Sequence, residues 1–146
     1  MFPGEEKLLL TRIHVPLLFY SPLHVDPGID SSVASEVDVL PSIATLTLSK
    51  FRNNALGRSL FNHSLDDNRS AFFIRHQYGP EIGVIQNDHL FQMKADGSNK
   101  RLHNIFAEEP ERNLYDIQRK LGKKLERFTR DYYETAKYLR YNNHID

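Results

Sequence analysis

The most apolar strand-length segment of the chain is residues 15–20, Val-Pro-Leu-Leu-Phe-Tyr. A continuous apolar run without alternation is typical of a strand covered on both faces, as in α/β sheets wrapped by helices. Pro16 cannot donate a hydrogen bond to a neighbouring strand, so it belongs at the strand's beginning, at an edge or at a bulge. We therefore predict a buried strand from Val15 to Tyr20.

A helix is predicted to follow, after a connection rich in Pro, Gly, Asp and Ser. Asp38 is suited to cap its N-terminus, and Pro41 falls within the first turn, where a missing N–H is tolerated. Apolar residues then recur at helical spacing, at Val39, Leu40, Ile43 and Leu46 or Thr47, so the helix is expected over residues 39–48. A strand, a short loop and a helix form half of a βαβ unit.

The pattern changes from residue 71 onward to short segments separated by turns. Asn87-Asp88 fits a tight hairpin turn, and Asp96-Gly97 is a second strong turn signal. These signals predict an antiparallel meander of four strands, over residues 71–76, 82–86, 89–94 and 100–105.

The last predicted element is a long amphipathic helix that covers the small sheet. Its apolar residues recur at steps of three and four, which places them on one helical face. They are Leu114, Ile117, Leu121, Leu125, Phe128, Tyr132, Ala136 and Leu139.

The charge of this helix allows two interpretations. Residues 111–140 contain nine Lys or Arg and five Asp or Glu. We interpret the charged side as a solvated outer face, and a surface for anionic lipid headgroups or polymer is the alternative. Tyr132, Tyr133, Tyr138 and Tyr141 are interpreted as core and rim packing, with a platform for sugar or lipid stacking as their alternative.

The composition limits the possible classes of protein. The 146 residues suit one domain or one large subdomain, and 19 basic with 19 acidic residues give a formal net charge of zero. That balance does not favour a nucleic acid partner. The chain has no cysteine, no apolar run long enough to span a membrane and no signal-peptide pattern at its beginning, so we expect the isolated chain to be soluble.

Three stretches carry a resemblance to sulfatase-type enzymes of the alkaline phosphatase superfamily. Residues 14–22, HVPLLFYSP, resemble the family's apolar "PLLIYSP" strand. Residues 35–42, SEVDVLPS, resemble its "SQVDLLPTLLDLLG" helix, and residues 56–60, LGRSL, its "LGRSLL" turn. Residues 101–114 and 132–143 are similar to the lipoteichoic acid synthase and phosphoglycerol transferase branch, so the resemblance covers about residues 13–143.

The resemblance implies an α/β fold, of which this chain is the C-terminal piece. Residues 1–63 would supply one strand and one helix to the main α/β/α sandwich, and residues 64–146 would form the antiparallel sheet and long helix, an α+β arrangement in isolation. The parent enzyme would lie at the periplasmic or extracellular face of a membrane. It would use a divalent metal, Mn²⁺, Mg²⁺, Ca²⁺ or Zn²⁺, on phosphate or sulfate esters.

In that family the nucleophile and the Asp-His-Gly metal motif precede the apolar strand, and neither motif occurs here. We therefore assign no catalytic residue and no metal ligand to this chain. The nearest candidates are Asp88-His89, in a predicted hairpin turn, and His24 with Asp26, after the predicted buried strand, where ligands of open α/β sheets gather. Both pairs are interpreted as turn or loop residues, with a substrate contact as the alternative for His24.

The other candidate residues show no usable spacing. His63, His76, His89 and His103 recur at nearly even intervals, but separate strands do not bring such residues to one point. The Gly-x-Ser-x-Gly context of a nucleophile elbow is missing around Ser21, Ser35 and Ser59, and Gly79, Gly83 and Gly97 form no phosphate loop.

We therefore expect a C-terminal fragment of a metal-dependent phosphoglycerol transferase or hydrolase, inert without its upstream catalytic portion. The alternatives are a stand-alone binding or assembly module that uses the basic helix or a sheet edge, and an intact arylsulfatase relative. A strand and helix taken from a larger sheet would expose apolar surface, or a second copy would cover that surface by self-association.

Overall fold

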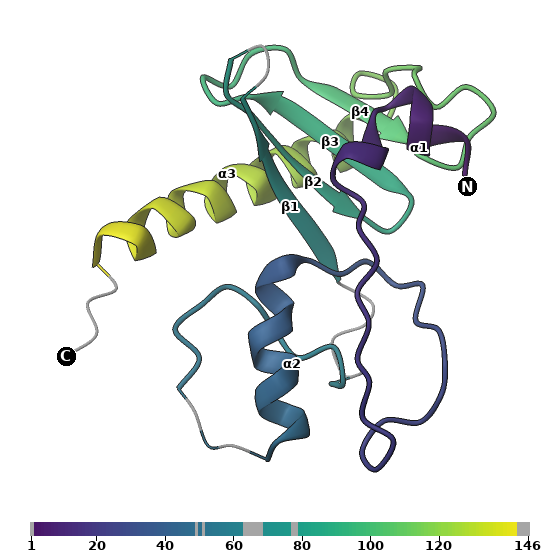
Figure 1. The fold of residues 1–146 in the computed structure, drawn as a ribbon. Coiled ribbons are helices and arrows are strands. Elements are labelled where there is room, and N and C mark those ends of the chain that lie inside the picture. Colours follow the sequence, from purple (N-terminus) through teal and green to yellow (C-terminus); the bar gives the residue numbers. More distant parts are fainter. Residues whose placement is uncertain (1, 49, 51, 63–68, 77–78, 143–146) are drawn as a thin grey trace.

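The computed structural model describes residues 2–48, 50, 52–62, 69–76 and 79–142. Its centre is an antiparallel sheet in which each strand pairs with its neighbour in sequence, in the order β1-β2-β3-β4 (Figure 1). The strands are β1 (Ser70–Arg75), β2 (Glu81–Gln86), β3 (His89–Lys94) and β4 (Arg101–Asn104). The predicted four-stranded meander is confirmed.

The turns use the residues that made them predictable. Gln86 pairs with His89, which leaves Asn87 and Asp88 as a two-residue hairpin loop. Asn87 has φ 50°, a left-handed conformation that Asn tolerates better than most residues. Gly97, with φ 86°, reverses the chain between β3 and β4.

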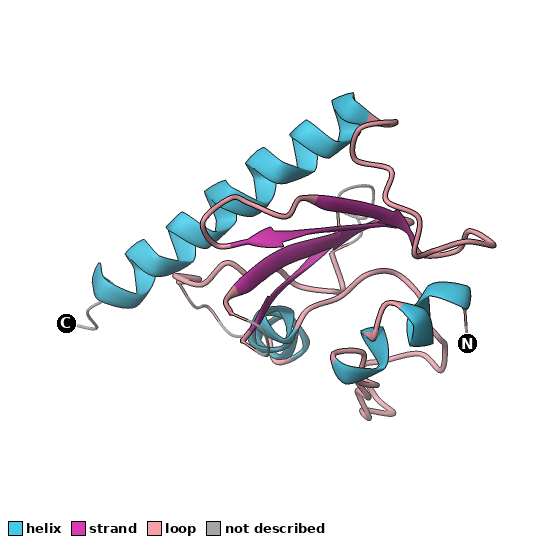
Figure 2. Ribbon diagram, turned by 90° about the horizontal axis from the view of Figure 1, so that it is seen from above, coloured by secondary structure: helices cyan, strands magenta, loops and turns pink. Residues whose placement is uncertain are grey.

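Helix α3 (Arg119–Asn142) covers one face of the sheet (Figure 2). The core between them consists of Ile82, Val84, Phe91, Met93, Leu102 and Leu125. The edge strand β1 joins this layer through Phe72, whose ring stacks on that of Tyr132 with 3.5 Å between the centroids. The sheet covered by a long C-terminal helix, a mixed α+β arrangement, agrees with the prediction.

The long helix begins later than its apolar pattern predicted. Leu114 donates its N–H to the carbonyl of Leu102 at 2.7 Å, and Asn113 accepts the N–H of Leu102 at 3.0 Å. The chain therefore lies along the outer edge of β4 before the helix starts at Arg119. As a result Leu114 is not helical, and Ile117, predicted on the apolar face, is 63% exposed.

The N-terminal residues cover the other face of the sheet, which the pattern did not predict. They form α1 (Pro3–Lys7) and η1 (Leu10–Arg12). Leu8 and Leu10 pack with Leu90 and Ile105 in a second core. Contact is close because Gly4 donates its N–H to the carbonyl of Ile105 at 2.8 Å, and a Cβ at that glycine would lie 2.6 Å from the same oxygen.

The predicted strand at Val15–Tyr20 is wrong for the chain as described. Residues 14–20 belong to no strand, and most of their side chains are exposed. The physical reason is that a buried strand needs neighbours. Each of the four strands pairs with its sequence neighbour, none pairs with residues 15–20, and the segment of residues 113–114 already lies along the edge of β4. No second sheet is present within the described residues.

The predicted helix is present as η2 (Glu36–Asp38) followed by α2 (Val39–Leu46). Asp38 precedes α2 as predicted, but its carboxylate makes no capping bond to that helix. The predicted boundary between residues 63 and 64 lies outside the described residues, so the division into two domains stays a prediction. None of the helices in the described ranges combines the length and apolarity that crossing a bilayer requires.

Candidate functional site

The extended segment of residues 14–21 presents apolar side chains to solvent. Val15 is 62% exposed, and Leu18 and Tyr20 are each 85% exposed. Phe19 is the exception, because its ring packs edge-on against that of Phe61 with 5.3 Å between the centroids. One aromatic contact therefore holds the segment in place while its other apolar side chains lack cover.

Helix α2 has one side that hydrogen-bonds to the rest of the chain and one side with exposed apolar residues. On the hydrogen-bonded side, the hydroxyl of Ser42 donates to the carbonyl of Asp38 at 2.6 Å and accepts the N–H of Leu60 at 2.9 Å. On the other side, Leu40 and Ile43 are exposed.

We call Val15, Leu17, Leu18, Tyr20, Leu40 and Ile43 together the apolar docking residues. Large contiguous apolar surfaces are unusual on a free monomer and mark sites of protein contact. These side chains are exposed in the described chain. That they belong to a strand and helix of a larger sheet stays a prediction.

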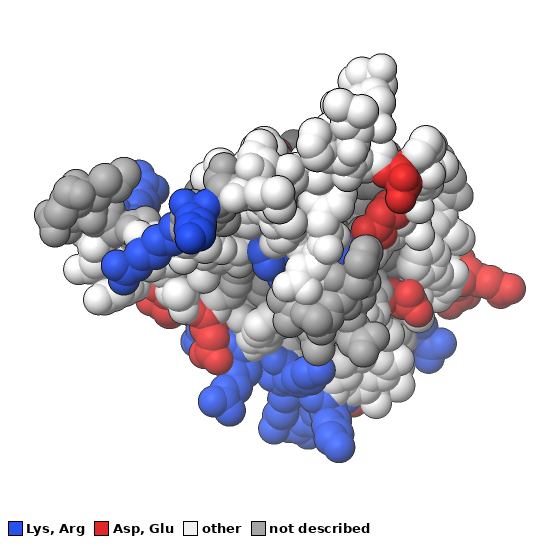
Figure 3. All heavy atoms as spheres, turned by 90° about the horizontal axis from the view of Figure 1, so that it is seen from below, with Lys and Arg blue, Asp and Glu red and all other residues white. Residues whose placement is uncertain are grey.

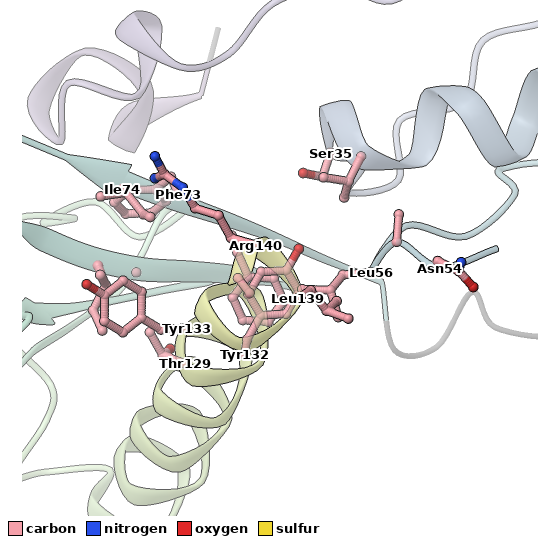
Figure 4. Close-up of a pocket in the computed structure, with 16 residues that line it drawn as sticks. Ser35, Asn54, Leu56, Phe73, Ile74, Thr129, Tyr132, Tyr133, Leu139 and Arg140 are labelled. Atoms are coloured by element: carbon pink, nitrogen blue, oxygen red, sulfur yellow. The ribbon is translucent and has the colours of Figure 1, made fainter. Parts of the chain in front are cut away.

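A hollow of about 560 Å³ lies between the sheet, α3 and the segments beside α2 (Figure 4). Tyr132, Tyr133 and Leu139 reach it from α3, Ile74 from β1, and Leu56 from the loop that follows α2. Its lining is mainly aliphatic and aromatic, so it suits an apolar group rather than a charged one.

The polar groups of this hollow do not form a catalytic arrangement. Thr129 is buried, and its hydroxyl has no hydrogen-bond partner within the described residues. Burial and the nearby charge of Asp38 raise the pKa of Tyr132, so its hydroxyl stays protonated. A nucleophile needs a base within hydrogen-bond reach. Among the described residues that line the hollow, Arg140 is the one charged side chain, and none is His, Asp, Glu or Lys.

The residues considered as metal ligands do not converge. His24 faces Ser21, with 3.0 Å between Nδ1 and the hydroxyl oxygen, and Asp26 is exposed. Asp88 is exposed in the hairpin loop, and His89 is partly buried at the start of β3. Within the described ranges, no group of three or more His, Asp or Glu side chains could hold a metal ion.

The evenly spaced histidines also remain apart. His76 is exposed at the end of β1, and His63 lies outside the described residues. His89 and His103 lie on opposite faces of the sheet, because Leu90 rather than His89 pairs with His103. Burial lowers the pKa of His103, whose Nδ1 lies 3.0 Å from the carbonyl oxygen of Pro110.

Two of the tyrosines fit the predicted packing role. Tyr132 and Tyr133 are partly buried against the sheet, and Tyr138 and Tyr141 are exposed towards the end of α3. Lys137 lies over the ring of Tyr133 at 5.2 Å.

The apolar hollow was not foreseen from the sequence, because its lining combines residues from β1, β2, α3 and the loop after α2. Only the helical spacing of Tyr132, Ala136 and Leu139 gave a signal for one wall. Comparison with known proteins adds no assignment: no family model matches the chain, and no curated protein matches it.

Proposed function

We propose that this chain is the C-terminal portion of a metal-dependent, sulfatase-like phosphoglycerol transferase or phosphate- or sulfate-ester hydrolase. In this role residues 15–20 and α2 join the main sheet of an upstream catalytic portion. The nucleophile, the divalent metal and its ligands belong to that portion, at the outer face of a membrane.

The observation that carries the proposal is the exposure of residues 15–20. A segment with the composition of an interior strand lies extended and without strand partners, and Leu18 and Tyr20 are each 85% exposed. Burial of apolar surface lowers the free energy by about 25 cal/mol per Å² removed from water, so covering these side chains would be stabilising. Adjacent strands of a main sheet would satisfy the backbone N–H and C=O groups, and helices packed on its faces would cover the side chains.

The second support comes from α2, which follows this segment in the chain. Its apolar side chains Leu40 and Ile43 remain exposed although Ser42 and Asp38 fix the other side of the helix. A helix that packs on one face of a sheet needs such an apolar side. The order of strand and helix matches the resemblance of residues 14–22 and 35–42 to the sulfatase family.

The test is an assay of phosphodiester, phosphomonoester and sulfate-ester hydrolysis with Mn²⁺, Mg²⁺, Ca²⁺ and Zn²⁺. It compares the 146-residue chain with a chain extended upstream to include an Asp-His-Gly motif. We expect metal-dependent turnover from the extended chain only.

Leu18→Asp in the extended chain should lower activity strongly, because it would bury a carboxylate in the sheet. Leu23→Asp, at a 90% exposed position outside the predicted strand, is the matched control and should have little effect. Turnover by the 146 residues alone would contradict the proposal and direct attention to His24, Asp26, Asp88 and His89. An upstream region without the motif would favour a stand-alone binding module.

A further inference from the structure

A second hollow, of about 570 Å³, lies beside the N-terminal half of α3, where Lys100, Tyr115 and Asp116 complete its lining. Five cationic side chains line it: Lys100, Arg119, Lys123, Arg127 and Arg130. Figure 3 shows Lys and Arg side chains gathered on the α3 side of the molecule. The formal net charge of the whole chain is zero, so this local excess of positive charge is a feature of the site.

Glu126, which also lines this basic hollow, is hydrogen-bonded to neighbouring side chains. The carboxylate of Glu126 accepts hydrogen bonds from the hydroxyl of Tyr115 and from Lys100, whose Nζ lies 2.8 Å away. Arg130 is a third partner, at 3.4 Å. The carboxylate of Glu126 is therefore paired, and its contact with Lys100 places that ammonium group in the lining of the hollow.

The remaining cations are placed to receive an anion. Arg119, Lys123 and Arg127 are spaced four residues apart, so they follow one another along one side of the helix. Within the described residues, no carboxylate forms an ion pair with Arg119 or Lys123. Arg127 contacts Asp131 at 3.6 Å in a pair that is largely exposed and therefore weak.

Like charges at this spacing destabilise a helix. A bound anion would reduce this repulsion. The nearest acid along the helix, Glu126, already pairs with Lys100 and Arg130. Among the described residues, Asp116 is the one other acidic residue of the lining besides Glu126.

We propose that this basic hollow binds a phosphate group. Arg119 and Arg127 can each donate two parallel hydrogen bonds to phosphate oxygens, and Lys123 between them supplies a point charge. Lys100, which directly precedes β4, adds a fifth cation to the four that α3 contributes to the lining. The inference does not depend on the proposed function, because the apolar docking residues do not line this hollow.

The experiment titrates the protein with phosphate groups from two sources and follows binding by amide chemical shifts. One arm uses inorganic phosphate and a soluble phosphate monoester. The other uses phosphatidylcholine vesicles with and without phosphatidylglycerol. Both arms compare the chain with Arg119→Gln/Lys123→Gln and with Lys120→Gln/Lys124→Gln, which removes the same charge from helix positions outside the hollow.

We expect phosphate to bind with its largest shifts near Arg119 and Lys123, and the first double variant to bind about tenfold more weakly. The second double variant should keep most of the affinity. Binding confined to the anionic vesicles, with the same difference between variants, would support the site and identify a lipid headgroup as the source. Equal weakening by both variants, or binding in neither arm, would overturn the inference. Circular dichroism of both variants checks that α3 remains folded.

Discussion

The carboxylate of Asp38 accepts the backbone N–H of Arg58 at 2.9 Å, across twenty residues of sequence. Its second oxygen accepts the N–H of Ser35, also at 2.9 Å. Asp38 is 5% exposed, so water cannot replace these bonds easily. One side chain therefore fixes both the start of the α2 region and the loop that returns beside it, and orients the exposed side of α2.

Asp38→Asn should destabilise this part of the chain. An amide has one oxygen, so one of the two backbone N–H groups would face an NH₂ group and lose its acceptor. We expect the free energy of unfolding to fall by about 1–3 kcal/mol, measured by urea denaturation. Asp26→Asn, at an exposed loop position, is the control. Equal stability of the two variants would contradict the role given to Asp38.

Gly57→Ala should disrupt the same region by a steric route. A Cβ at residue 57 would lie 1.7 Å from the carbonyl oxygen of Val37, which is far inside van der Waals contact. The loop must then move away from η2, and we expect a loss of about 2 kcal/mol or more by thermal denaturation. Gly28→Ala is matched to it, because a Cβ there meets nothing within 4 Å. A normal melting temperature for Gly57→Ala would show that the close approach is absent in solution.

Leu125→Ala tests the packing of α3 on the sheet. Leu125 is 1% exposed and belongs to the core with Phe91 and Leu102. Removing its side chain should lower the free energy of unfolding by about 2–5 kcal/mol. Ile117→Ala, at a position 63% exposed, should change it little. Equal effects of the two variants, or the opposite order, would contradict this packing of α3 on the sheet.

The network around Glu126 predicts a dependence of stability on acid. Burial alone would raise the pKa of Glu126, but hydrogen bonds from Lys100 and Tyr115 outweigh it and hold the pKa below its usual value. Because the folded-state pKa is the lower one, this stabilisation is complete above the unfolded-state value and is lost as pH falls through the folded-state value.

Glu126→Gln should therefore reduce the difference in unfolding free energy between neutral and strongly acidic pH. Glu108→Gln, at an exposed position, is the control and should leave the difference unchanged. An identical acid dependence in the chain and in Glu126→Gln would contradict the assignment.

The sheet and its turns could be predicted from the sequence because their signals are local. Asn87 and Gly97 occupy turn positions with positive φ, which Asn and Gly adopt more readily than other residues. Alternating apolar and polar residues indicate the strand between these two turns. The start of α3 could not be predicted in this way, because Leu114 has the correct helical spacing but bonds to Leu102 instead. The attachment of α1 through Gly4 depends on a hydrogen bond to Ile105, 101 positions later, and no local pattern contains such a contact.

The same distinction applies to the candidate sites. The pattern of residues 15–20 indicates burial, yet burial requires a neighbouring strand, so the described chain leaves the segment exposed. The basic hollow could not be predicted from the sequence. Lys100 and Tyr115 lie beside the cations of α3 only because the chain runs along the edge of β4 before the helix begins. The nine Lys and Arg of residues 111–140 predicted a positively charged surface but did not predict a hollow.

The central claim is that residues 15–20 form an interior strand when the upstream portion is present. Amide hydrogen exchange of Leu17, Leu18 and Tyr20 tests it most directly, in the 146-residue chain and in the upstream-extended chain. We predict fast exchange in the 146-residue chain, where these amides lack strand partners, and exchange slowed by orders of magnitude in the extended chain. Fast exchange in both chains would contradict the claim.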